Sequence, residues 1–245
     1  MTANDKTSQS ESMKLSVITV TYNAAAVLQR TMESVLDQPA DVDYIIVDGG
    51  SSDDTISIVE SFGDRIRFIS EPDNGIYDAM NKGIRMARGQ GMLFMNAGDY
   101  LQGSVLTDEI SIPCFLPVYY TDPLGRFRRI PIKKASRGIP NCHQGIVFER
   151  RTPAIFYDPG YRVASDLDFF LRYEYDETLP VANTAGYVLY DNAGFSKQNI
   201  RIRDAEIASI VKKHFGTLAA LRFRTIAWIK RLAGSLLPSR RAQTS

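Results

Sequence analysis

The sequence predicts an α/β fold with a mostly parallel sheet and helices on both faces. Short β-branched and apolar runs alternate with helical patterns through the first hundred residues. The runs are followed by loops of Asn, Asp, Ser and Gly, which favour turns and helix starts. Strands that alternate with helices at this spacing are typical of right-handed βαβ units.

The expected elements of the first half follow one another in a regular order. They are strand 15–21, helix 24–38, strand 44–47, a helix ending at residue 62, strand 66–69, helix 76–88 and strand 92–95. Ser52 or Asp53 is expected to cap the second helix, because their side-chain oxygens accept bonds from free helix N–H groups. Gly89 and Gly91 are expected to end the third helix.

The second half has an α+β pattern and is expected to form the other wall of a cleft. It contains a hairpin within 114–130, strand 144–148, helix 166–175, strand 186–190 and helix 202–215. We predict a disordered extension at 1–12 without a signal peptide, a ligand-binding half at 13–100, a second half of the same domain at 101–215, and a C-terminal helix and tail at 216–245.

Composition narrows the class of protein. The chain has 245 residues, with 29 Lys and Arg against 28 Asp and Glu, so its net charge of +1 does not indicate a nucleic-acid partner. Its two cysteines, Cys114 and Cys142, match no metal-ligand spacing and make no disulfide framework. A reducing cytoplasm is the simplest interpretation, and no segment offers the ~18 apolar residues that a membrane span requires.

The segment 70–100 contains the strongest functional signal. Asn96-Ala97-Gly98-Asp99 follows the fourth strand, and the carboxyl edge of an open α/β sheet is where ligands bind. Taken alone, Asp99 fits a turn residue better than a ligand-binding one. Its meaning depends on the other motifs of the chain.

Four ordered blocks resemble family 2 glycosyltransferases of the GT-A fold, and within that family the bacterial exopolysaccharide enzymes of the colanic-acid type. The blocks are 17–23, 46–53, 73–83 and 96–99, with scattered similarity at 142–144, 165–168 and 192–196. The resemblance implies an inverting, hexosyltransferase-type enzyme that uses a nucleotide-diphosphate sugar. It also implies a mobile loop near Gly194-Phe195-Ser196 that closes on the donor.

The resemblance assigns Asp99 as the ligand of Mg²⁺ or Mn²⁺, which would neutralise the leaving diphosphate. Asn96 and Gly98 stand where relatives have further carboxylates. The residues expected to contact the donor are Thr19, Thr21, Asn23, Asp48, Asp78, Lys82 and Asn96. These residues also have structural alternatives. The alternatives are hydrogen bonds at strand ends, a helix-entry loop in which Asp48 accepts bonds from backbone N–H groups, and an i,i+4 ion pair between Asp78 and Lys82.

The resemblance also assigns Asp166 as the general base, since Arg172 follows it by six residues as in the family. Asp168 is the second candidate for the base. The structural alternative for Asp166 is that it is a first-turn acidic residue favoured by the helix dipole. His143, Gln144 and Asp168 are expected on the acceptor side, although a lone His is more often a hydrogen-bonded wall residue.

The C-terminal segment 217–237 has a helical pattern with basic residues largely opposite an apolar side. The apolar side comprises Leu218, Leu221, Thr225, Ile229, Leu232 and Leu236. Such a helix suits either the inner surface of the cytoplasmic membrane, with a polyprenyl-linked glycan acceptor in exopolysaccharide synthesis, or packing on the domain.

Two other functions use a similar α/β sheet or nucleotide-sugar site. The reduced carboxylate motif is compatible with a non-catalytic subunit that binds a nucleotide sugar or assists assembly. A nucleotidyltransferase requires a Gly-rich, Lys- or Arg-bearing loop after the first strand, and 22–26 reads Tyr-Asn-Ala-Ala-Ala instead.

Overall fold

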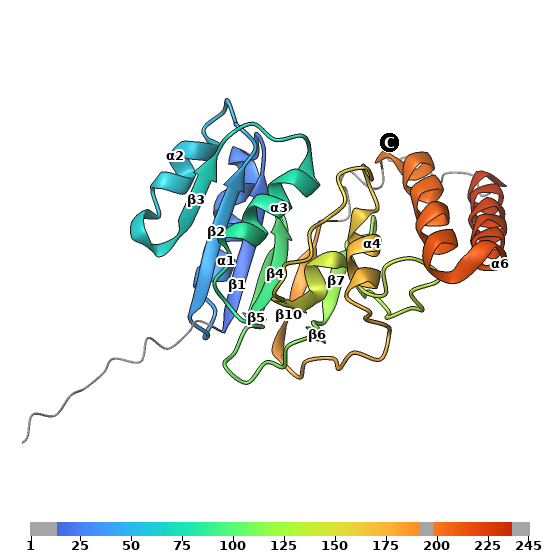
Figure 1. Cartoon of the computed structure of the whole chain (residues 1–245). Coiled ribbons are helices and arrows are strands. Elements are labelled where there is room, and N and C mark those ends of the chain that lie inside the picture. The colour runs from blue at the N-terminus through green and yellow to red at the C-terminus, as the bar shows by residue number, and fades with distance from the viewer. Residues whose placement is uncertain (1–13, 192–197, 237–245) are drawn as a thin grey trace, which may run out of the picture.

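The computed structural model describes residues 14–191 and 198–236. A six-stranded sheet has the order β3-β2-β1-β4-β9-β6 and forms the centre of the molecule (Figure 1). The predicted extension at 1–12 and the predicted mobile loop at 194–196 lie outside the described residues.

The first four strands are parallel, as predicted. They are β1 (Leu15–Thr21), β2 (Val42–Asp48), β3 (Arg67–Ser70) and β4 (Gly91–Asn96). Val20 of β1 lies beside Val47 of β2 and Asn96 of β4, so the loops after these strands share one edge. The sheet is mixed because β9 (Ile146–Glu149) runs antiparallel between β4 and β6 (Cys114–Phe115).

Helices cover both faces of this sheet. Helices α1 (Ala25–Leu36) and α2 (Thr55–Glu60) pack on one face with Val17, while α3 (Ile76–Met86) packs on the other with Ile18. Adjacent residues of a strand point to opposite faces, and every residue of β1 is buried. Both faces of this strand are therefore covered, which explains why its sequence is largely apolar. Gly83 permits close packing of α3, because a Cβ there would lie 2.3 Å from Cγ2 of Ile18.

A second sheet has the order β5-β10-β7-β8 and was only partly predicted. Its strands are β5 (Tyr100–Ser104), β10 (Ala185–Tyr190), β7 (Val118–Thr121) and β8 (Phe127–Arg129). The predicted hairpin is the β7–β8 pair, whereas Cys114 and Phe115 join the first sheet. Strand β5 was missed because only one of its five residues is buried, which leaves no apolar pattern.

The C-terminal part of the chain adds α4 (Ser165–Arg172) and the long α6 (Ile200–Leu236), which lie together beside the central sheet (Figure 1). Gly216 has a φ of 84° and divides α6 into two helical segments, as the sequence predicted. No helix within 14–191 and 198–236 is long and apolar enough to cross a membrane.

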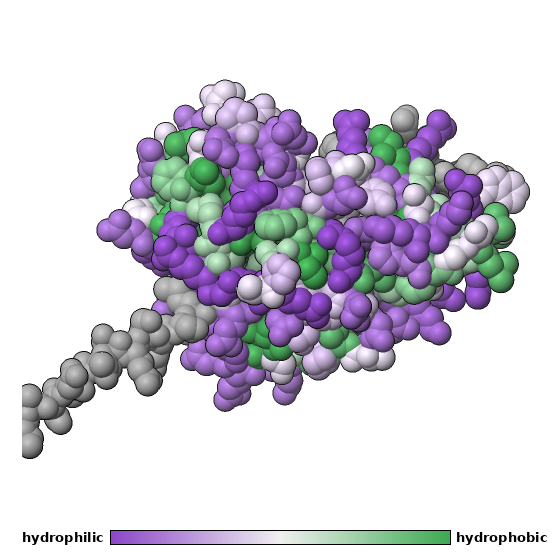
Figure 2. Space-filling model, in the orientation of Figure 1, coloured by the Kyte–Doolittle hydropathy of each residue, from purple (hydrophilic) through white to green (hydrophobic). Residues whose placement is uncertain are grey.

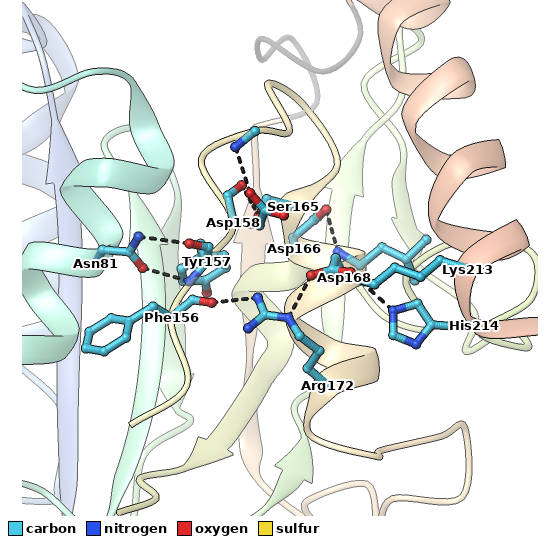
Figure 3. Close-up of polar contacts among 12 residues, drawn as sticks. Asn81, Phe156, Tyr157, Asp158, Ser165, Asp166, Asp168, Arg172, Lys213 and His214 are labelled. Atoms are coloured by element: carbon cyan, nitrogen blue, oxygen red, sulfur yellow. Dashed lines mark hydrogen bonds and ion pairs between the residues drawn. The ribbon is translucent and has the colours of Figure 1, made fainter. Parts of the chain in front are cut away.

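The buried carboxylate of Asp168 holds α4 against α6 (Figure 3). Its oxygens accept hydrogen bonds from Arg172 at 2.7 Å, Lys213 at 2.9 Å and His214 at 3.1 Å. Burial by itself raises the pKa of Asp168, but these three partners outweigh it and lower the pKa below its usual value. We call this group the Asp168 cluster.

Glu206 of α6 fixes the start of α4. Its carboxylate accepts the backbone N–H groups of Arg162, Val163 and Ala164 at 2.7, 2.8 and 2.9 Å. Ala164, the residue that precedes α4, makes no capping bond with its own side chain. A side chain from another helix therefore satisfies three consecutive backbone N–H groups of the segment that leads into α4.

A third contact ties the segment before α4 to α3. Asn81 of α3 donates from Nδ2 to the carbonyl of Tyr157 at 3.0 Å and accepts the Tyr157 N–H at 2.7 Å (Figure 3). The first turn of α4 is thus held from two sides, by α3 and by α6.

We predict that Asp168→Asn lowers the free energy of unfolding by about 2 kcal/mol, since it leaves three basic groups facing a neutral amide. Because the native pKa of Asp168 is lowered, its stabilisation is present at neutral pH and is lost as pH falls below about 4. Denaturant unfolding at pH 7 and pH 3.5 measures both effects. Asp64→Asn, at an exposed carboxylate, is the control, and equal acid sensitivity of wild type and Asp168→Asn would contradict the prediction.

Candidate functional site

A cavity of about 1350 Å³ lies at the carboxyl end of β4. Its wall comes from α3, the segments 96–99 and 130–144, the start of α4, the end of β10 and both segments of α6. Both halves of the chain therefore contribute to one site, as the sequence predicted for a cleft between them. Such a location is where an open α/β sheet binds ligands.

Buried oxygens without partners mark the end of β4. Asp99 is 2% exposed, and its Oδ1 accepts the N–H of Asp191 at 2.8 Å. Its Oδ2 is buried and makes no hydrogen bond with a described residue, and the same holds for Oδ1 of Asn96 and Oγ1 of Thr21. Buried acceptors rarely stay unpaired, so these oxygens at the ends of neighbouring strands fit a bound cation or a donor group.

The Asp99 carboxyl is hard to ionise in the absence of a cation. Burial raises its pKa to about 7, and the nearby carboxylate of Asp191 adds to the shift, while backbone N–H groups and the Gln144 amide offset part of it. A divalent cation would reverse this balance, since it favours the charged form. The donor set thus fits a hard metal ion.

Asp191 is a cavity residue that sequence reasoning missed. It follows β10, which pairs antiparallel with β5 so that Leu189 faces Tyr100. This register brings Asp191 next to Gly98: a Cβ on Gly98 would lie 3.8 Å from Oδ2 of Asp191. The only sequence signal was an Asp directly after a predicted strand, and the pairing partner of that strand was unknown.

Asp166 lies on the first turn of α4 and lines the same cavity. Burial raises its pKa to about 6, repulsion from Glu206 adds to this, and Lys133 partly offsets it. Burial also raises the pKa of the Cys142 thiol, and the charges of Asp99 and Asp166 both add to that shift. The carboxylates of Asp99 and Asp166 are therefore both close enough to the Cys142 thiol to affect its pKa.

His143 and Gln144 belong to the short helix η2 (His143–Gly145) and line the cavity. Nε2 of His143 is 2.6 Å from the hydroxyl of Tyr157, and its ring packs 5.2 Å from that of Phe94. Burial lowers the pKa of His143 to about 3, so the ring is neutral at physiological pH. Oε1 of Gln144 accepts a hydrogen bond from the Cys142 thiol at 2.7 Å.

Asp168 occupies a different environment from Asp166, although only one residue separates them. Its side chain is buried in the Asp168 cluster, and among the residues that the structure describes it is not part of the cavity wall. The structure thus supports a structural role for Asp168 rather than contact with an acceptor.

Two of the predicted donor residues are fully buried and make hydrogen bonds within the protein. Thr19 is fully buried, with its Oγ1 3.1 Å from the hydroxyl of Tyr44. Asp48 is also fully buried and accepts hydrogen bonds from the backbone of Gly50 and Ser51 and from the hydroxyls of Ser51 and Ser70. These are the contacts that the structural alternatives predict.

Of the remaining predicted donor residues, Asn23 lies in the loop after β1, whereas Asp78 and Lys82 lie on α3. Asn23 accepts the Ser52 N–H at 2.8 Å, and Asp78 accepts the Asn74 N–H at 3.1 Å. The ion pair of Lys82 is with Glu71, at 3.0 Å, so the i,i+4 alternative with Asp78 is not what the structure shows.

Comparison with known proteins gives one consistent family. Residues 16–110 match the model of glycosyl transferase family 2. A PGL/p-HBAD biosynthesis glycosyltransferase of Mycobacterium tuberculosis is 33% identical over an alignment of 181 residues, and the match covers 64% of this chain and 68% of the relative. An uncharacterized glycosyltransferase of the same species is 39% identical over 177 residues, with the same shares of both chains.

Solved structures share the fold at low identity. Staphylococcus aureus TarS 1–349 in complex with UDP-GlcNAc matches with a TM-score of 0.63 and 16% identity over 94% of this chain and 77% of that one. The mannosyltransferase PcManGT of Pyrobaculum calidifontis, in complex with GDP-Man and Mn²⁺, matches with a TM-score of 0.56 and 14% identity over 92% of this chain and 76% of that one. This chain spans 46% of a longer TarS structure.

The α/β fold with a helix-flanked mixed sheet, the cavity at the carboxyl end of β4 and these similarities agree with one another. They identify an enzyme that transfers glycosyl groups. The chain belongs to glycosyltransferase family 2.

Proposed function

We propose that this enzyme moves a sugar from a nucleoside diphosphate to an acceptor hydroxyl with inversion at the anomeric carbon. The observation that carries the proposal is a single cavity lined by Asp99 and Asp191 at one end and by Asp166 on α4. One direct displacement inverts the configuration and needs a group that holds the diphosphate and a base for the acceptor.

Asp99, Asp191 and Asn96 are the residues that would hold Mg²⁺ or Mn²⁺. The support is the buried, unpartnered oxygens of Asp99 and Asn96, with the Asp191 carboxylate beside Gly98, a position at which the family resemblance implies a carboxylate. When bound, the cation would supply positive charge to the leaving diphosphate. Asp191 thus compensates in space for a carboxylate that the 96–99 segment lacks.

Asp166 is the proposed base. With a pKa raised to about 6 it is mostly ionised at pH 7, yet more basic than an exposed aspartate. The Glu206 and Asn81 contacts hold the segment before it, so the carboxylate has a defined position relative to Asp99. Asp166 would accept the proton of the acceptor hydroxyl as the new glycosidic bond forms.

The proposed acceptor is a glycan carried on a lipid, with exopolysaccharide synthesis on a polyprenyl carrier at the inner face of the cytoplasmic membrane as the proposed setting. Apolar side chains of the second segment of α6, including Phe223 and Ile226, line the cavity together with Arg222. A wall of this kind suits an acceptor that combines an apolar chain with a phosphate.

We predict that Asp166→Asn lowers the turnover rate about 10²- to 10⁴-fold while donor binding stays intact, because only the proton acceptor is removed. For wild type, kcat/KM falls as pH drops through about 6, since the protonated carboxyl cannot act as base. The measurement is nucleoside diphosphate release from a panel of nucleotide sugars, with Mn²⁺ and a lipid-extract acceptor.

Asp64→Asn is the matched control and should keep wild-type turnover. Full activity of Asp166→Asn would exclude Asp166 as the base. Donor binding by wild type without any nucleoside diphosphate release across the panel would instead favour a non-catalytic binding subunit.

We predict that Asp99→Asn abolishes the Mn²⁺-dependent part of the thermal shift caused by a nucleotide sugar, and that Asp191→Asn reduces it. Without metal at pH 8, Asp99→Asn should be at least as stable as wild type, because the burial that raises the pKa of Asp99 disfavours its charged form. A donor-dependent shift that survives Asp99→Asn unchanged would exclude Asp99 as a metal ligand.

A further inference from the structure

The second segment of α6, which follows Gly216, has apolar residues on two faces. Ala220 is 6% exposed, and Phe223, Ile226 and Ala227 line the cavity, so one face packs toward the domain. The residues of the opposite face are the outer stripe: Leu218, Leu221, Thr225, Trp228 and Ile229.

The outer stripe shares Leu218, Leu221, Thr225 and Ile229 with the apolar side that the sequence predicts, and it points away from the domain. Leu218 is 82% exposed, Leu221 54%, Trp228 58% and Ile229 52%. Figure 2 shows apolar side chains gathered at the outer edge of the molecule, over this part of α6. Packing against the domain therefore leaves the stripe uncovered, and four large apolar side chains along one helix face form a contiguous patch.

Charge indicates what covers this patch. From Gly216 to Ser245 the chain has six Lys and Arg residues and no Asp or Glu. Arg222 and Arg224 flank the outer stripe, are exposed, and make no ion pair with any described residue. Apolar residues bordered by uncompensated positive charge match a bilayer with anionic headgroups, whereas a second copy of the same helix would bring like charges together.

The position of the cavity agrees with this orientation. Leu218 and Arg222 belong to both the exposed surface and the cavity wall, so the cavity reaches the surface beside the outer stripe. A helix lying in the plane of the headgroups would bring that opening to the bilayer. Trp228 is the type of residue that settles at this depth, because its ring is apolar and its N–H is polar.

We propose that the second segment of α6 is a membrane-surface helix that inserts the outer stripe into an anionic bilayer and holds the cavity next to lipid-linked acceptors. The acceptor part rests on the proposed function, whereas the membrane contact stands on the exposure and charge of the helix itself. The helix lies in the surface and does not span the bilayer.

Trp228 makes the test direct, because it is the only tryptophan of the chain. Its fluorescence emission should shift to shorter wavelength when the full-length protein is mixed with phosphatidylcholine vesicles that contain phosphatidylglycerol. The shift should be much smaller with phosphatidylcholine alone and should decrease with added salt, since the Arg contribution is screened. Co-sedimentation with the same vesicles measures the bound fraction.

Leu221→Glu and Ile229→Glu should each weaken vesicle binding at least about tenfold, because a carboxylate replaces an inserted side chain. Leu124→Glu is the matched control: Leu124 is 73% exposed on the β7–β8 turn, so the same change there should leave binding unaltered. Thermal unfolding checks that all three variants fold.

The proposal is overturned if wild type does not bind the anionic vesicles, or if the outer-stripe variants bind as well as wild type. It is also overturned if the Trp228 shift appears without vesicles as protein concentration rises and sedimentation velocity shows a dimer. Nucleoside diphosphate release with a detergent-dispersed acceptor should persist in both variants. Vesicle binding without any turnover would support the membrane helix and contradict the proposed function instead.

Discussion

The contact between α4 and α6 is the constraint on which the site depends. Asp168 binds Arg172, Lys213 and His214, while Glu206 accepts three N–H groups just before α4. Both interactions join segments that are more than forty residues apart in sequence. Because Asp166 lies on the turn between these anchor points, its position in the cavity is set by partners on another helix. Loss of either the Asp168 or the Glu206 contact would make the position of Asp166 less defined, although neither contact involves the Asp166 side chain.

The same residue type behaves differently at three places because burial and partners differ. Asp168 is buried among three basic groups, which lower its pKa, whereas Asp99 and Asp166 are buried with fewer compensating partners and have raised pKa values. A carboxyl that is poorly compensated in the protein alone is suited to a cation or a substrate proton. The electrostatic environment thus separates a structural aspartate from the two proposed functional ones.

The long α6 combines structural and proposed functional roles along its length. Its first segment supplies Glu206, Lys213 and His214 to the α4 contact. After Gly216, the second segment lines the cavity on one side and exposes apolar residues on the other. A membrane contact at the outer stripe would therefore be linked through one helix to the position of Asp166. This arrangement suits an enzyme whose donor comes from water and whose acceptor comes from a bilayer.

The sequence by itself determined the parallel first half, the helices on both faces and the location of Asp99 at a strand end. The reason is that the periodicity of apolar residues and the residue types of the loops are local properties of the chain. It also placed Asp166 at a helix start and found the amphipathic stripe of 217–237. Only the tertiary structure decided that Asp191 lies beside Gly98, that Asp168 is a structural residue, and that the stripe faces outward. Each of these depends on strand register or on contacts between distant helices, and neither is encoded in the spacing of neighbouring residues.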